Sequence, residues 1–257
     1  MENEITVLDM EQGRSIFLRD TTGKTILLDV GEKSESEKKE AWQEKVTTSN
    51  AKRSLIPYLK SRGVAKIDQL VLTDNEPKQL DHVLEISKAF DLGEILVTEE
   101  TLSQREFMDK LTESKVKVGV IKTGQQLSIF GSSLEVIASQ NRENKSLIAL
   151  YGKLLNQTFL VTGNTEEKFL TIHYPKFQVD VVINHQKSSK KNSDIEAFKT
   201  FQPKVAVISV DKKKTFKVKN GENYQEDKNI ENSIYKTDTK GAIRFRGWSS
   251  WQIETVR

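Results

Sequence analysis

The sequence contains no cysteine among its 257 residues. Disulfides, thiolate metal sites and cysteine nucleophiles are therefore excluded together. The absence leaves the compartment open, because a chain without cysteine suits an oxidising or a reducing environment.

Long apolar runs are also missing, since no stretch approaches the roughly 18 residues that a membrane helix needs. The acidic opening 1–4 has neither the basic nor the apolar region of a signal peptide. With 36% hydrophobic and 30% charged residues, the composition is typical of a soluble globular protein with a heavily charged surface. We therefore expect any membrane-spanning segment of a parent protein to lie outside this chain.

Neither sign of charge dominates, because 40 basic and 37 acidic residues give a formal charge of +3. That balance does not by itself indicate a nucleic-acid partner. Basic residues cluster at 187–191 and at 212–219. A run of this kind is usually a solvated loop, so only its position in the fold can make it a binding site.

The first sixty residues indicate a meander followed by a helix. Strand-like runs occur at 5–8, 15–19 and 24–30. The Glu/Lys/Ser-rich segment 32–49 has no apolar period, so we expect an exposed loop there. A helix that is capped by Asn50 should follow and end at Gly63.

From residue 70 onward, strands and helices alternate. We expect strands at 70–73 and 95–98, each followed by a helix, at 80–90 and 101–111 respectively. Thr101 and Gln104 have the spacing of a capping box that opens the second helix. Alternation of this kind indicates a parallel sheet with crossover helices.

The middle of the chain returns to short strands, which we assign to a second mixed sheet. The expected strands are 117–121, 126–129, 134–139, 147–151 and 158–162. A strand–helix–strand unit follows, with strands at 179–183 and 205–210 and, between them, a helix capped by Ser193. We predict one α/β domain over residues 1–257, in which two β-rich halves that carry helices pack as a sandwich.

Short motifs at the expected strand ends occur in a definite order. The first three are DMEQGR at 9–14, LDVG at 28–31 and LVLT at 70–73; FLVTGN at 159–164, VVINH at 181–185, IYKTD at 234–238 and GAIRF at 241–245 follow. Together they resemble the C-terminal metallo-β-lactamase-like domain of ComEC-type DNA-uptake channel proteins. The resemblance covers nearly the whole chain and implies an αββα sandwich of two mixed sheets flanked by helices.

The residues that hold metal in that fold are largely replaced. The superfamily places a His-x-His-x-Asp-His loop after the threonine, where imidazoles and a carboxylate converge on zinc. Counted on from Thr73, these positions are Asp74, Glu76, Lys78 and Gln79. None is a histidine, and the lysine ammonium has no lone pair to donate to a metal.

The other ligand positions have changed as well. Asn164 stands for the bridging carboxylate, and Asn184 and His185 stand for a pair of histidines. An amide lacks the charge that holds two cations together. Arg14 replaces the last aspartate of the first motif and would add positive charge beside the site. With only three histidines in the chain, the resemblance implies a degenerate site, and we expect no zinc.

A hard cation is the alternative occupant of this altered site. Oxygen donors of the kind that manganese and magnesium prefer are present in Asp9, Asp29, Asp74, Glu76 and Asn164. The simpler interpretation is that Arg14 and Lys78 neutralise these acids as ion pairs. Asp9 and Asp29 would then anchor strand ends through hydrogen bonds.

Asp81 and His82 resemble the Asp-His ending of the metal motif. Their use as ligands would require a slip of three residues into the expected start of a helix. A lone histidine on a helix is more often a surface or core residue.

The resemblance implies a part in DNA internalisation during natural transformation, without catalysis because the ligands are lost. DNA would be bound weakly and without sequence preference, by lysines and arginines that contact phosphates. The candidate contacts are Arg142, Lys145, Lys187, Lys190 and Lys191. The other implied partner is the transmembrane channel portion of the same polytopic membrane protein, which places the domain at the extracellular face of the cell membrane.

Two further functions remain open. One is a metal-dependent nuclease that degrades the non-transforming DNA strand, with manganese or magnesium at the altered site. The other is a protein-docking platform that uses Trp248 and Trp251, although tryptophans beside a C-terminal strand more often belong to a core.

Overall fold

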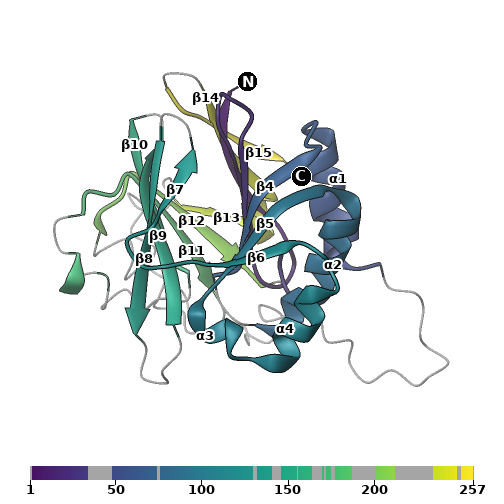
Figure 1. Ribbon diagram of the computed structural model, residues 1–257. Helices are drawn as coiled ribbons and strands as arrows, with labels where there is room; N and C mark the ends of the chain where they lie inside the picture. The colour runs from purple at the N-terminus through teal and green to yellow at the C-terminus, as the bar shows by residue number, and fades with distance from the viewer. Residues whose placement is uncertain are drawn as a thin grey trace, which may run out of the picture.

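Two β-sheets form the two layers at the centre of the protein in the computed structural model (Figure 1). The structure describes residues 2–33, 48–73, 76–129, 132–140, 146–154, 156–163, 170, 172–174, 177–186, 201–211, 234–247 and 250–256. In this part of the chain, no helix is both long and apolar enough to cross a membrane. The predicted arrangement of two mixed sheets with flanking helices is confirmed.

The first sheet has eight strands and joins the two ends of the chain. Its order is β15-β14-β1-β2-β3-β4-β5-β6, antiparallel from β15 to β3 and parallel from β3 to β6. The strands are β1 (Asn3–Leu8), β2 (Ser15–Arg19), β3 (Thr25–Leu28), β4 (Lys66–Val71), β5 (Asp91–Val97), β6 (Lys117–Val120), β14 (Ala242–Gly247) and β15 (Gln252–Val256).

The second sheet has seven strands in the order β13-β12-β11-β10-β9-β8-β7. It is antiparallel from β7 to β10 and parallel from β10 to β13. The strands are β7 (Gln126–Ile129), β8 (Ser132–Gln140), β9 (Ser146–Leu154), β10 (Gln157–Val161), β11 (Val181–Gln186), β12 (Val205–Val210) and β13 (Ile234–Lys236).

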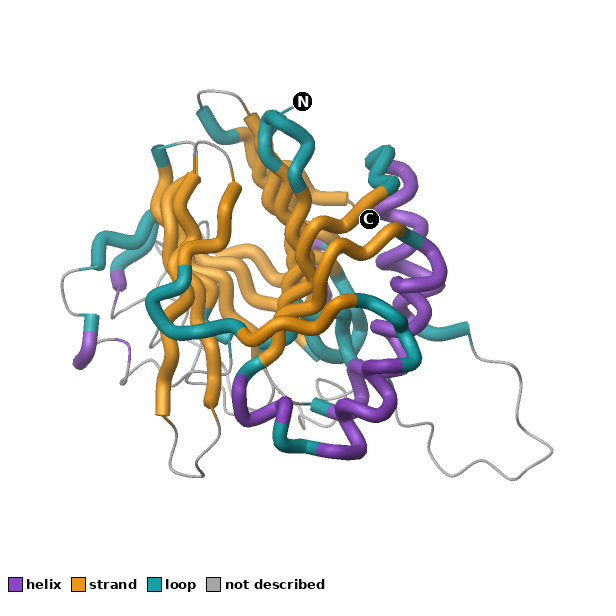
Figure 2. Tube along the Cα trace, in the orientation of Figure 1, coloured by secondary structure: helices purple, strands orange, loops and turns teal. Residues whose placement is uncertain are grey.

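Helices cover the face of the first sheet that points away from the second (Figure 2). A π-helical turn, η2 (Ala51–Leu55), leads into α1 (Ile56–Ser61), and a 3-10 turn, η3 (Pro77–Gln79), leads into α2 (Leu80–Ala89). Two short helices follow β5, namely α3 (Glu99–Leu102) and α4 (Arg105–Thr112), and α9 (Thr237–Lys240) precedes β14.

Strand β2 shows why the first sheet is apolar on both faces. Ile16 and Leu18 pack into the core between the sheets, whereas Phe17 packs into the core under the helices. Successive side chains of a strand point to opposite faces, so a strand that is buried on both sides needs a continuous apolar run. The loops at the ends of these buried strands are thereby held in fixed positions.

Three local predictions were wrong. β6 belongs to the first sheet, where it pairs in parallel with β5, and not to the second. The helix expected at 101–111 is divided into α3 and α4, and Thr98, not Thr101, caps it by accepting a hydrogen bond from the Thr101 amide. Asn50 makes no side-chain cap, because its side-chain oxygen accepts a hydrogen bond from the Arg53 guanidinium (2.5 Å) while its side-chain nitrogen donates to the Met10 carbonyl oxygen (2.8 Å).

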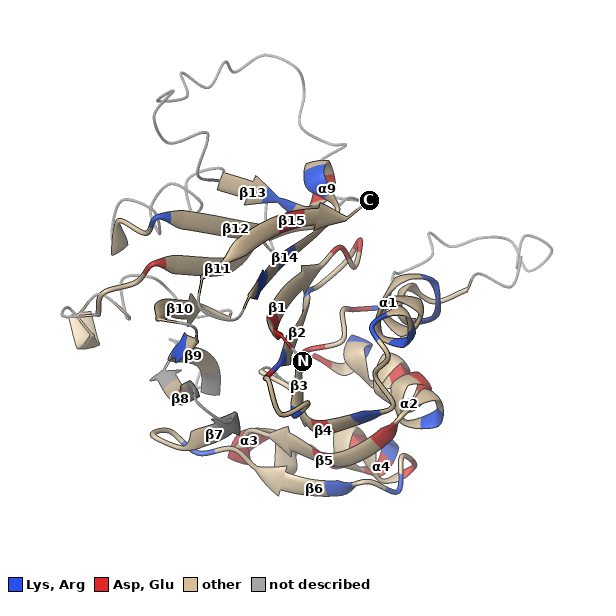
Figure 3. Cartoon of the chain, turned by 90° about the horizontal axis from the view of Figure 1, so that it is seen from above, with Lys and Arg blue, Asp and Glu red and all other residues tan. Residues whose placement is uncertain are grey.

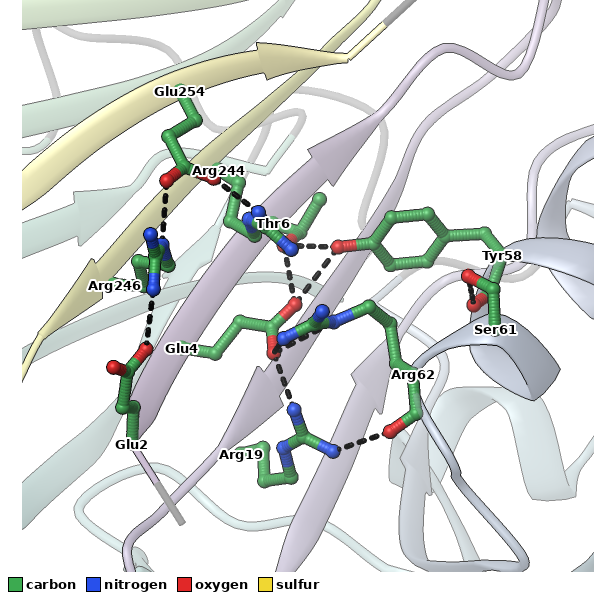
Figure 4. Close-up of polar contacts among 10 residues, drawn as sticks. All are labelled: Glu2, Glu4, Thr6, Arg19, Tyr58, Ser61, Arg62, Arg244, Arg246 and Glu254. Atoms are coloured by element: carbon green, nitrogen blue, oxygen red, sulfur yellow. Dashed lines mark hydrogen bonds and ion pairs between the residues drawn. The ribbon is translucent and has the colours of Figure 1, made fainter.

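A buried ion-pair network holds α1 to the first sheet (Figure 4). Glu4 on β1 is 1% exposed. Its carboxylate accepts hydrogen bonds from Arg19 (2.7 Å), Arg62 (3.1 Å) and the Tyr58 hydroxyl (2.8 Å). Burial by itself would raise the pKa of Glu4, but the hydrogen bonds from Arg62 and Tyr58 outweigh it and leave the pKa below its ordinary value of 4.5.

Acid is therefore expected to destabilise the protein in part through Glu4. A carboxyl group with a lowered folded-state pKa contributes stability above its unfolded pKa, and this contribution is lost as the pH falls through the folded value. Urea unfolding between about pH 6 and about pH 3 should show a falling midpoint, and the fall should be smaller in Glu4→Gln. Equal slopes in both proteins would show that Glu4 does not contribute to the pH dependence.

Candidate functional site

The candidate site lies where the carboxyl ends of parallel strands from both sheets meet. Asp29 follows β3 and Thr73 follows β4 in the first sheet, while Gly163 follows β10 and Asp211 follows β12 in the second. Ligand sites of α/β proteins commonly lie at this end of parallel strands. Residues of the motifs at 28–31 and 70–73, and Gly163 of the third motif, thus lie near one another.

At the centre of this site, a buried ion pair joins Arg14 and Asp29. Their side chains are 3% and 5% exposed, and Nη2 of Arg14 lies 2.7 Å from Oδ2 of Asp29. Nε of Arg14 donates to the same oxygen (2.8 Å), and Nη2 donates to the Thr73 hydroxyl (2.5 Å). The prediction that Arg14 neutralises an acid of the altered site is confirmed for Asp29.

Asp29 also fixes the end of β4. Its carboxylate accepts hydrogen bonds from the backbone amide and the hydroxyl of Thr73, both at 2.8 Å. Its backbone has φ +54°, a left-handed conformation that aspartate tolerates better than most residues. The Ser15 hydroxyl donates to the Asp29 carbonyl oxygen (2.9 Å). Asp29 is therefore the strand-end anchor that the sequence predicted.

The loop that precedes Arg14 connects this cluster to the second sheet. The Gly13 amide donates to Oδ1 of Asp211 (2.8 Å), and the Ser209 hydroxyl donates to the Gly13 carbonyl oxygen (3.3 Å). Gly13 has φ +71°, and a Cβ at this position would lie 2.8 Å from the Glu32 backbone nitrogen. Only glycine fits there without strain.

Sequence reasoning did not identify Asp211 as part of the site. It is 4% exposed, and its carboxylate bonds a backbone amide that lies 198 positions earlier in the chain. A contact of this kind depends on how the sheets pack, so a short sequence motif cannot predict it. The basic run that begins at residue 212 drew attention to the following residues instead.

The positions that follow Thr73 do not form a ligand cluster in the described residues. Glu76 directly precedes the turn η3, and Lys78 is exposed. Gln79 is buried, and its side-chain oxygen accepts a weak hydrogen bond from the Val30 amide (3.4 Å). Asp74 lies outside the described residues.

In the second sheet, Asn184 accepts a hydrogen bond from the Thr162 hydroxyl (2.8 Å) through its side-chain oxygen. This contact joins the ends of β10 and β11. Asn164 and the side chain of His185 lie outside the described residues, so their predicted positions beside the site remain predictions.

His82 belongs to α2 and is 1% exposed. Its Nδ1 lies 3.0 Å from the Val30 carbonyl oxygen, so this nitrogen must carry the proton and donate. The histidine therefore acts as a core residue that ties α2 to the segment after β3. The slipped alignment that would use Asp81 and His82 as ligands receives no support.

The described residues do not fit a two-metal centre. Among them, no three His, Asp or Glu side chains are grouped in a way that could hold a metal ion. Asp29, the carboxylate at the centre of the site, is already neutralised by a guanidinium group. A second cation beside that buried guanidinium would meet like charge in a region of low dielectric.

The candidate DNA-binding residues Arg142, Lys145, Lys187, Lys190 and Lys191 all lie outside the described residues and stay predictions. Basic and acidic residues are mixed along α2 and α4 (Figure 3). That mixture agrees with the balanced composition and does not indicate an anion-binding face on these helices.

The position of Trp251 weakens the hypothesis that this residue docks a protein partner. Trp251 packs against Phe159 and Phe245, with ring centroids 4.9 and 5.5 Å apart, at the core between the sheets. Trp248 lies outside the described residues.

The sequence is similar to that of "ComE operon protein 3" from Bacillus subtilis (strain 168). The two are 23% identical in an alignment that covers 95% of this chain and 33% of the relative, so the chain spans about a third of that protein's length. No family model matches the chain.

Solved structures with the same arrangement of elements include YhfI, a metallo-β-lactamase fold protein from Bacillus subtilis, with a TM-score of 0.57 and 11% identity over 81% of this chain and 86% of YhfI. A diphosphatase of the PhnP family gives a TM-score of 0.57 with 10% identity, covering 96% of this chain and 98% of that one. CmlA, a diiron β-hydroxylase from Streptomyces venezuelae, gives a TM-score of 0.52 with 13% identity, covering 80% of this chain and 44% of CmlA. The chain therefore has the metallo-β-lactamase fold, and its sequence is similar along nearly its whole length to a part of ComE operon protein 3.

Proposed function

We propose that this chain is a domain of a competence DNA-uptake channel protein and takes part in DNA internalisation without hydrolysing DNA. Two findings support the first part: the similarity to ComE operon protein 3 over 95% of the chain and the metallo-β-lactamase fold. The proposed setting is a polytopic membrane protein, with this domain at the extracellular face and next to the channel portion of the same protein.

The observation that supports the absence of hydrolysis is the position of the Arg14 guanidinium. It binds Asp29 and Thr73 at the strand ends where the fold's metal motif would begin. Metal-dependent hydrolases need a cation that keeps an open position for water and lowers the pKa of that water. A guanidinium supplies hydrogen-bond donors and charge, but it has no coordination position for water.

The proposed contact with DNA is electrostatic and independent of base sequence. Lysines at 187, 190 and 191 follow β11, which ends at the same edge as the candidate site. Phosphate contacts of this kind release counterions, so affinity falls steeply as salt rises. Arg142 and Lys145 are proposed as further contacts.

Single-stranded DNA binding by the purified chain should weaken by about tenfold or more between about 50 and 200 mM salt. The variant Lys187→Glu/Lys190→Glu/Lys191→Glu should bind less tightly, and the slope of log affinity against log salt should fall by about two. Fluorescence anisotropy with a labelled oligonucleotide measures both quantities.

The matched control is Lys60→Glu/Lys88→Glu/Lys115→Glu, which makes the same charge change at three exposed positions on or after helices α1, α2 and α4. Its affinity should stay closer to that of the unmodified chain. Equal losses in both variants would show that only net charge matters and would contradict the assigned contacts.

The same protein should leave labelled DNA intact with manganese, magnesium or zinc present. Cleavage that disappears in Asp74→Ala would instead establish the alternative, a metal-dependent nuclease acting on the non-transforming strand.

A further inference from the structure

We propose that Arg14 is a built-in substitute for the metal ions of this fold: a tethered cation that joins the strand-end loops of both sheets and makes folding independent of metal. The inference concerns stability and metal affinity, and it holds or fails independently of any contact with DNA.

Charge is the first reason. The Asp29 carboxylate is 5% exposed at the ends of β3 and β4, and a buried carboxylate is strongly unfavourable without a counter-charge. In a metallohydrolase of this fold, bound cations provide positive charge at the strand ends. Here Arg14 provides it, with two of its nitrogens 2.7 and 2.8 Å from one carboxylate oxygen.

Position is the second reason, because the guanidinium lies between the two sheets. On one side it contacts Asp29 and Thr73 of the first sheet. On the other, Nη2 is 3.7 Å from the place that a Cβ of Gly163 would occupy, at the end of β10. The adjacent Gly13 is bonded to Asp211 after β12. Arg14 thus lies at the ends of β4 and β10, two of the strand ends after which the resemblance places metal ligands.

The third nitrogen of the Arg14 guanidinium, Nη1, bears on whether Arg14 stabilises the site by its charge or by its hydrogen bonds. Nη1 of Arg14 is buried, and no residue that the structure describes is hydrogen-bonded to it. The contacts that the described residues show are made by Nε and Nη2, and both nitrogens face the Asp29 carboxylate, so we infer that Arg14 acts mainly by neutralising Asp29. A lysine at this position would keep the charge while losing the two-nitrogen contact, so it should retain part of the stability.

The test uses thermal unfolding of the full chain and of Arg14→Met, Arg14→Lys, Asp29→Asn and the double variant Arg14→Met/Asp29→Asn. Arg14→Met should lower Tm by on the order of 10 °C, because it leaves a buried unpaired carboxylate. Arg14→Lys should lose less. The double variant should lose clearly less than the sum of the two single losses, since no unpaired charge remains. Asparagine suits position 29 because it also tolerates positive φ.

Metal provides the second measurement. The unmodified chain should bind neither metal and should therefore unfold at the same temperature with EDTA, with manganese and with zinc. A metal that bound only the folded state would raise Tm. Arg53→Met is the matched control, since Arg53 is half-exposed and paired with Glu11; it should change Tm by a few degrees at most.

Three results would overturn the inference: an Arg14→Met loss no larger than that of Arg53→Met, additive losses in the double variant, or a Tm that EDTA lowers or manganese or zinc raises. Should Arg14→Met fail to fold, Arg14→Lys and Asp29→Asn still provide the comparison. None of these results depends on DNA. Cleavage of DNA would contradict the proposed function, but the inference about Arg14 would still be tested by the unfolding temperatures of the variants.

Discussion

Replacing Asp29 with alanine should lower the free energy of unfolding by about 3–5 kcal/mol, because it leaves the buried Arg14 guanidinium without its counter-charge. The change also removes the hydrogen bonds to the Thr73 amide and hydroxyl and places alanine at φ +54°. Urea unfolding followed by circular dichroism gives the free energy directly.

Two variants separate these contributions. Asp29→Asn keeps a side chain that tolerates positive φ and can still accept a hydrogen bond from Thr73, so its difference from Asp29→Ala reports backbone strain and that hydrogen bond together. Asp109→Ala removes an exposed aspartate whose ion pair with Arg105 is solvated, and it should cost less than about 1 kcal/mol. An equally small loss in Asp29→Ala would show that the buried pair does not organise the site.

Replacing Phe245 with alanine should cost about 3–5 kcal/mol as well. Phe245 on β14 is 1% exposed and packs edge-to-face against Phe159 of the second sheet, with ring centroids 5.9 Å apart. It also contacts Trp251. The deletion therefore leaves a cavity between the two sheets, and urea unfolding measures its effect.

The same experiment tests the prediction that residues 1–257 form one domain. If they do, Phe245→Ala should shift a single transition that is seen alike by circular dichroism and tryptophan fluorescence. Two separate transitions, with only one of them shifted, would indicate independently folding units. Phe245→Leu is the control, since a smaller change of volume should cost less.

Strand positions were the most predictable part of the fold. The bounds of β2, β7 and β12 agree with the sequence prediction, because each is a short run with apolar side chains and has polar or turn residues at or near its ends. The neighbour of a strand is less predictable. β6 was assigned to the second sheet from its place in the sequence, but its pairing with β5 is set by a crossover through α3 and α4.

Helix ends were less predictable for a physical reason. Thr98 and Thr101 both have a side chain that can cap, and their hydroxyls are hydrogen-bonded to each other at 2.7 Å. Sequence spacing favoured Thr101, whereas the extended backbone of Thr98 makes it the actual cap. Asn50 likewise has the chemistry of a cap, but its side-chain oxygen accepts from the Arg53 guanidinium and its side-chain nitrogen donates to the Met10 carbonyl oxygen.

The centre of the site was partly predictable. Arg14 stands where related motifs have an acid, and buried carboxylates need a partner, so the sequence predicted that Arg14 neutralises an acid of the site. That this acid is Asp29 came from the structure. The roles of Thr73 and Asp211 did not follow from the sequence. Thr73 is hydrogen-bonded to Asp29, and Asp211 to the Gly13 amide, and only the packing of the sheets brings these loops together.

The fold by itself does not decide the chemistry. Among the structures it resembles are a diphosphatase and a diiron β-hydroxylase. A shared scaffold can host unrelated reactions, so function has to be argued from the residues at the site. In this chain those residues include a buried cation that is part of the polypeptide.

The most direct test is the metal content of the purified full chain after equilibrium dialysis against zinc or manganese, measured by mass spectrometry. A guanidinium in place of the cations predicts a content far below one ion per chain. A content of about one or two ions per chain that is lost in Asp74→Ala or His185→Ala would contradict this account.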